Sequence, residues 1–239
     1  MHHQSNLEPR PNRHASAPTM ERVVRWPLGV AVGFLAFVGI AASATFYLRE
    51  PANLGFLDFP TIVALHVVLG AFYLMFAPFQ FVKRIRSRHL GYHRRMGRVL
   101  VAVGLVVGVT ALFIGLVIPF SGWAERVLIG PFGSLFLFAL GKGFVHVRAG
   151  RVALHREWMI RAFAIALAIA TQRLIFIPSL FVVVDPTGGQ IVTLSIAAWS
   201  AALVVHSSLA EVWIRLTRKR RVPKASETRA AHGPTLGSR

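Results

Sequence analysis

The chain has 239 residues, of which 54% are hydrophobic and only 15% charged, a balance too apolar for a soluble protein of this length. The net charge is +18, which would suit a nucleic-acid-binding protein. However, Lys and Arg form short clusters between apolar runs rather than one polar face, so we do not prefer that interpretation. Cysteine is absent, which excludes thiol nucleophiles, disulfides, iron–sulfur clusters and covalent c-type haem.

The N-terminal segment, residues 1–19, is polar and unpatterned, and we expect it to be disordered. Met20 opens the stretch MERVVRWPLG, which is typical of the natural start of a membrane protein, so residues 1–19 would lie upstream of the true start. No small-residue cleavage site follows the first apolar run, so we do not interpret that run as a cleaved signal peptide.

The apolar runs that follow are long enough for membrane helices, which need about twenty apolar residues to cross the hydrocarbon layer. They must be helices, because a lone strand cannot satisfy its backbone hydrogen bonds in lipid. Six runs qualify: about residues 27–48, 60–82, 97–118, 127–147, 158–177 and 191–213. The sequence therefore predicts an all-α polytopic membrane protein, with a six-helix transmembrane bundle over residues 20–217 and a basic, disordered tail over residues 218–239.

The connections between the runs alternate in charge. Basic residues gather before the first run, in the second connection (KRIRSRHLGYHRR), in the fourth connection and after the last run. The other three connections are nearly bare of Lys and Arg and hold Glu50, Asp58, Glu125 and Asp185. Positive residues stay on the cytoplasmic side of a membrane. We therefore expect an N-in/C-in topology, with both termini cytoplasmic.

The second run carries polar residues at intervals of seven: His66, Tyr73 and Gln80, with Gly70 and Ala77 between them. Seven residues are almost two helical turns, so all five share one face. A polar face with small residues packs against other helices rather than lipid. His66 could serve there in an interhelical hydrogen bond or as a ligand.

The fourth run holds Gly130, Ser134 and Gly141, which we expect to form a close-packing face, and Lys142, which we expect to extend towards the cytoplasmic interface.

The fifth run carries Arg161 near its cytoplasmic end and the buried polar residues Gln172 and Arg173 near its outer end. Arg161 can reach the interface. Arg173 lies on the side where topology does not call for a positive charge, so we expect it to face Asp185, Asp58 or a bound anion.

Several stretches in order resemble a family of predicted bacterial integral-membrane proteins known only as domain of unknown function 2306. They are LHVVLGAFYLMFAPFQF, HRRMGR and HREWMIRAFAIALAIATQR, within about residues 60–178. The resemblance implies a bacterial inner-membrane location and no particular chemistry. The positions it marks are His66, Gly70, Gln80, His93, Arg94, Gly97, Arg98, His155, Arg156, Trp158, Met159, Arg161 and Arg173.

The histidines suggest a cofactor. His93, His146, His155 and His206 fall towards the cytoplasmic side of the bundle, whereas His66 stands alone towards the outer side. A membrane b-type haem takes two neutral imidazoles at matching depth on different helices. The cytoplasmic group could supply one such pair and His66 has no counterpart, so we expect membrane electron transfer through a single haem b as the first interpretation. We expect no other metal.

Two further interpretations remain open. In the first, the protein binds or transports an anion or an anionic lipid headgroup near the helix N-termini that carry His93 and His155. The residues that would hold the anion are Arg94, Arg98, Arg156 and Arg161. In the second, the histidines only cap helices and pack, and the protein is structural, without a cofactor. The sequence contains no hydrolase or transferase motif, and it leaves open whether the protein is an enzyme.

Overall fold

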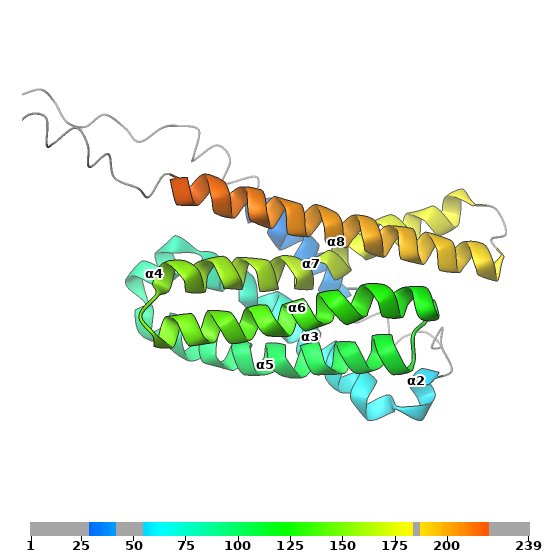
Figure 1. The fold of residues 1–239 in the computed structure, drawn as a ribbon, viewed down its shortest axis with the longest axis horizontal. Helices are drawn as coiled ribbons and strands as arrows, with labels where there is room; N and C mark the ends of the chain where they lie inside the picture. The colour runs from blue at the N-terminus through cyan, green and yellow to red at the C-terminus, as the bar shows by residue number, and fades with distance from the viewer. Residues whose placement is uncertain (1–28, 42–54, 184–186, 220–239) are drawn as a thin grey trace, which may run out of the picture.

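The structure is a computed structural model that describes residues 29–41, 55–183 and 187–219. Within these residues every regular element is a helix and none is a strand (Figure 1). The disorder predicted for residues 1–19 and for most of the C-terminal tail, and the predicted start at Met20, lie outside the described residues.

The described helices include five that are long and apolar enough to cross a membrane, namely α3, α5, α6, α7 and α8. They match the last five predicted spans. The first predicted span, residues 27–48, is described only as the apolar helix Gly29–Ala41. The labelled helices are α2 (Gly55–Asp58), α3 (Pro60–Phe81), α4 (Lys83–Arg88), α5 (Leu90–Val117), α6 (Trp123–Arg148), α7 (Val152–Val182) and α8 (Gly188–Lys219).

The helices extend beyond the apolar runs that predict them. α5 begins at Leu90 rather than near residue 97, so the stretch HRRMGR lies inside its first turns. α7 runs from Val152 to Val182 and passes through Pro178, one residue beyond the predicted span 158–177. A proline removes one N–H from the helix ladder, and neighbouring helices make this tolerable in a membrane bundle.

The long helices run antiparallel, and each packs mainly against the next along the chain (Figure 1). The core lies between α3, α5, α6 and α7 and includes Tyr73, Leu140 and Leu167. The helix Gly29–Ala41 approaches α3 and α7 at Gly39, where a Cβ atom would lie 2.6 Å from Cδ1 of Leu74 and 3.5 Å from Cβ of Ala170.

α5 and α6 approach closely at the glycines of α5. A Cβ on Gly104 would lie 2.9 Å from Cδ1 of Leu140, and one on Gly108 would lie 2.5 Å from Cδ2 of Leu137. These glycines are four residues apart, the small-xxx-small spacing that lets membrane helices pack closely. The seam between α5 and α6 therefore depends on the absence of side chains at both positions.

The predicted close-packing face of α6 is wrong at Gly141, where a Cβ atom would have no neighbour within 4 Å. The crowded glycines of α6 are Gly133, which faces Leu112 of α5, and Gly143, which faces Met159 of α7. The spacing of small residues predicts that they share a face, but it does not indicate which face meets a neighbour.

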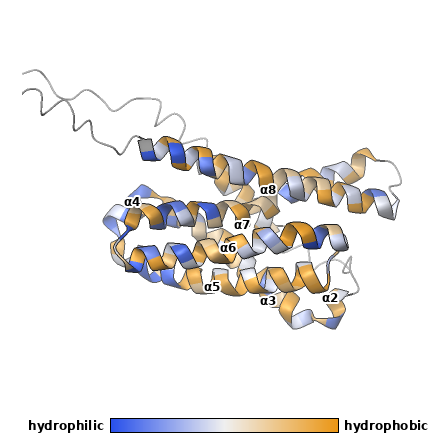
Figure 2. Cartoon of the chain, in the orientation of Figure 1, coloured by the Kyte–Doolittle hydropathy of each residue, from blue (hydrophilic) through white to orange (hydrophobic). Residues whose placement is uncertain are grey.

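The alternating course of the helices brings the ends of α3, α6 and α8 together with the starts of α5 and α7. Figure 2 shows hydrophilic residues concentrated at this end of the bundle, beside long apolar helices. We call it the basic end; it carries Lys83, Arg84, Arg86, Arg88, Arg94, Arg95, Arg98, Arg148, Arg151 and Arg156. The opposite end carries Asp58 and Glu125, whose carboxylate accepts the backbone N–H of Ser121 at 2.8 Å.

Candidate functional site: a histidine cluster at the basic end

His155 lies in the first turn of α7 and reaches across to α6. Its Nδ1 lies 2.8 Å from the carbonyl oxygen of Gly143. A carbonyl oxygen only accepts hydrogen bonds, so Nδ1 carries the proton, and in the neutral ring Nε2 is the basic nitrogen. Within the described residues Nε2 of His155 has no hydrogen-bond partner. The hydrogen bond at Nδ1 therefore fixes the orientation of this imidazole, and its Nε2 is available to a ligand.

His93 occupies the corresponding place in α5, three residues after the first residue of its helix. Its Nδ1 is buried and has no hydrogen-bond partner among the residues that the structure describes. His93 lies close enough to His155 for a charge on one ring to act on the other. The two imidazoles thus come from different helices and lie near the same end of the bundle.

Gln80 of α3 lies beside this face of α5. Its Oε1 is 3.6 Å from where a Cβ would stand on Gly97, which is one turn after His93. Both polar atoms of its amide are buried, and no described residue forms a hydrogen bond with them. His146, in the last turn of α6, likewise has a buried Nδ1 without a partner in the described part of the chain. We call Gln80, His93, His146 and His155 the histidine cluster.

The buried polar atoms of the histidine cluster are unusual, because leaving such an atom unpaired costs about 1 to 3 kcal/mol. They come from α3, α5 and α6 and gather at the end of the bundle where His155 also lies. A ligand or water that pairs with them would remove this cost. In the described part of the chain no group of three or more His, Asp or Glu side chains could hold a metal ion.

The other two histidines are engaged elsewhere. Nδ1 of His66 in α3 lies 3.2 Å from the carbonyl oxygen of Val107 and 3.1 Å from the hydroxyl of Thr110. His206 of α8 is buried, and its Nε2 lies 2.7 Å from the hydroxyl of Thr171 in α7. The sequence analysis places His206 with the cytoplasmic histidines. In the structure its ring instead contacts Thr171 of α7.

The arginines expected to hold an anion have different surroundings. Arg161 forms two hydrogen bonds to the carboxylate of Glu211 in α8, at 2.5 and 3.1 Å, and its guanidinium lies 4.7 Å from the ring centre of Trp158. Arg94 and Arg98 are exposed in α5. Arg156 donates a hydrogen bond to the hydroxyl of Thr217 at 3.0 Å. These four arginines therefore differ in their contacts within the described residues, and only Arg161 is seen paired with a carboxylate.

Sequence reasoning missed Glu157, which stands just before the predicted fifth span. This carboxylate is buried and pairs with Arg218 of α8, accepting a hydrogen bond from its Nε at 2.9 Å. The spacing of charged residues could have indicated this pair. Glu157 and Arg161 are four residues apart on α7, and they pair with Arg218 and Glu211 of α8. These two ion pairs connect α7 with α8 at the basic end.

The other polar residues that the sequence predicts to be buried lie away from the cluster. Tyr73 is buried in the core edge-on to Phe136, with ring centres 6.0 Å apart, and Gln172 is also buried. Arg173 lies near enough to His66 for its charge to act on that ring. Among the described residues no hydrogen bond or ion pair involves Arg173; Asp58 does not pair with it, and Asp185 lies outside those residues.

Residues 63–214 match a family model described as predicted membrane protein (DUF2306). No curated protein and no solved structure matches the chain. The match covers α5, α6 and α7 completely, with most of α3 and α8, and it includes all members of the histidine cluster.

Proposed function

The chain belongs to the DUF2306 family of predicted membrane proteins, and we propose that it transfers electrons in the membrane through one b-type haem held by the histidine cluster. The membrane would be the inner membrane of a bacterium. The haem would be held by His93 of α5 and His155 of α7, because these imidazoles come from different helices at one end of the bundle.

The observation that carries the proposal is the hydrogen bond from Nδ1 of His155 to the carbonyl oxygen of Gly143. Histidines that ligate a metal usually donate their second ring nitrogen to a carbonyl or carboxylate, which fixes the tautomer and leaves Nε2 as the ligand. The unpaired buried nitrogens of His93 and His146 support the same conclusion, because they indicate polar groups positioned for a partner that no described residue provides.

Bound haem would supply reversible one-electron transfer. The chain's own residues would hold and orient the group: His155 through its tie to α6, and His93 through its place in the first turn of α5. Arg94 and Arg98 are exposed at the same end and would offer positive charge to the haem propionates. The engagement of Arg161 with Glu211 favours this interpretation over an anion site built from all four arginines.

The test is an absorption spectrum of the protein purified after expression with a haem supply. We expect a low-spin b-type spectrum for wild type and its loss in His93→Ala and in His155→Ala, since one remaining imidazole cannot keep the same coordination. His89→Ala is the matched control, because His89 is exposed at the start of α5 and stands outside the cluster.

His66→Ala provides a second control, because this ring is held by Val107 and Thr110 on the other side of the bundle. The proposal is contradicted if well-folded wild type carries no Soret band. It is also contradicted if the spectrum survives in both His93→Ala and His155→Ala while those variants elute and melt like wild type.

A further inference from the structure

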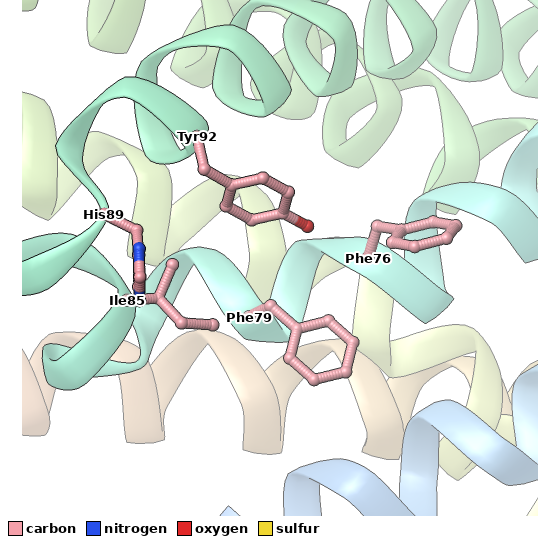
Figure 3. A pocket seen from close by; sticks show the side chains of 5 residues that line it. All are labelled: Phe76, Phe79, Ile85, His89 and Tyr92. Carbon is pink, nitrogen blue, oxygen red and sulfur yellow. The ribbon is translucent and has the colours of Figure 1, made fainter.

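A groove opens at the basic end between the end of α3, α4 and the start of α5. Its volume is about 370 Å³, and it is lined by Phe76, Phe79, Ile85, His89 and Tyr92. Figure 3 shows the phenylalanine side chains and Ile85 along the groove, with the ring of Tyr92 extending over it and its hydroxyl directed towards the α3 side. The lining is almost entirely apolar, which suits a hydrocarbon chain.

Positive charge borders this groove. Lys83, Arg84 and Arg88 are exposed on α4, and no described residue forms an ion pair with any of them. Arg84 and Arg88 are one turn apart and immediately precede the lining residues Ile85 and His89 in the chain. The charged side chains therefore stand beside the apolar groove rather than on the far side of the helix.

The protein does not neutralise these charges with its own described acids. Glu157 and Glu211 at the basic end are already paired with Arg218 and Arg161. The other two described acids, Asp58 and Glu125, lie at the opposite end of the bundle. An anion from outside the chain would complement α4, and the phosphate group binds arginine particularly well because its oxygens match the guanidinium.

We propose that the groove is a binding site for an anionic phospholipid, with an acyl chain lying along Phe76, Phe79 and Ile85 and the phosphate held by Arg84 and Arg88. The adjacent apolar and cationic surfaces match the two parts of such a lipid, and short basic segments at a membrane surface attract anionic headgroups. The Tyr92 hydroxyl ends over the groove, where it can donate to a lipid ester or phosphate oxygen. This site is separate from the histidine cluster and does not depend on the haem.

The experiment offers delipidated protein an equal mixture of phosphatidylglycerol and phosphatidylcholine in detergent and counts the bound lipids by native mass spectrometry. We expect wild type to retain phosphatidylglycerol in preference. The double variant Arg84→Gln/Arg88→Gln should reduce that preference roughly tenfold, because it removes two of the charges that attract the headgroup.

The matched control is Arg148→Gln/Arg151→Gln, which removes two exposed charges from the same end of the bundle but from the turn between α6 and α7. It should keep the wild-type preference. Ile85→Trp fills the groove without changing any charge, and it should lower phosphatidylglycerol retention severalfold.

Three results would overturn the proposal. Equal retention of the two lipids by wild type would mean that the headgroup is not selected. An equal loss in both double variants would mean that overall charge attracts the lipid and that α4 has no special part. Unchanged phosphatidylglycerol retention in Ile85→Trp would mean that the lipid binds outside the groove.

Discussion

Arg161 and Arg173 both belong to α7, but their guanidinium groups have different surroundings. Arg161 is paired with Glu211 and lies over Trp158, and the two charged side chains keep 22% and 40% of their surfaces exposed. Arg173 has no anionic partner among the described residues and lies near His66. A paired cation is stabilised by its partner, whereas an unpaired cation away from water carries a desolvation cost that nothing repays.

The same substitution should therefore act differently at the two positions. Arg161→Leu should lower the stability by about 1 to 2 kcal/mol, discounted for the exposure of the pair. Arg173→Leu should melt at or above the wild-type temperature, because it removes a charge that no described residue compensates. The two effects are compared by measuring the melting temperatures of both variants and of wild type in the same detergent at low salt. A loss at Arg173 as large as that at Arg161 would reveal an anionic partner there.

Residue-scale contacts of this kind were only partly predictable. The sequence correctly indicated that His93 and His155 stand at helix starts, because basic residues and apolar runs mark where those helices begin. It could not indicate that Nδ1 of His155 meets the carbonyl of Gly143, since that depends on how α6 and α7 pack. Glu157 was missed because it lies one residue outside the apolar run, although the helix already covers it.

At the scale of the elements, the seam between α5 and α6 depends on glycines. Gly104 and Gly108 leave no room for a Cβ beside Leu140 and Leu137. The apolar runs predicted α3 and α5 to α8 well, because a membrane helix needs a long uninterrupted run. They could not identify the crowded glycines, because Gly141 and Gly143 look alike in the sequence and only the second meets a neighbour.

Substituting these glycines tests the seam. In Gly108→Leu the new Cβ would lie 2.5 Å from the side chain of Leu137 and 2.9 Å from that of Phe136. Because these side chains would have to move, we expect the free energy of unfolding to fall by about 1 to 3 kcal/mol. Gly141→Leu is the matched control in open space and should melt within a degree or two of wild type. Equal melting of Gly108→Leu and wild type would contradict the packing of α5 on α6.

At the scale of the whole molecule, the alternating helices gather the histidine cluster, the arginines and the apolar groove at one end. The opposite end has few basic residues and two described acids. This asymmetry is the pattern that the positive-inside rule requires of a membrane protein. It supports the sequence-based prediction of six spans with the basic end and both termini in the cytoplasm.

Reporter fusions test that orientation. A reporter placed after Arg221 should behave as cytoplasmic, because it follows the basic end of α8, and one inserted at Gly188 should behave as periplasmic, because it lies at the opposite end. The two positions control for each other, since they flank the same helix. The reverse pattern at both sites would invert the proposed topology, and the same compartment at both sites would mean that α8 does not span the membrane.

The haem content per chain is the most direct measure of the proposed function. The proposed haem uses two imidazoles of the histidine cluster, His93 and His155, while His66 and His206 are held by threonines. The pyridine haemochrome spectrum of protein purified after expression with a haem supply, divided by the chain concentration, should therefore give close to one haem b per chain. A value near zero in folded protein, or a value near two, would contradict the account.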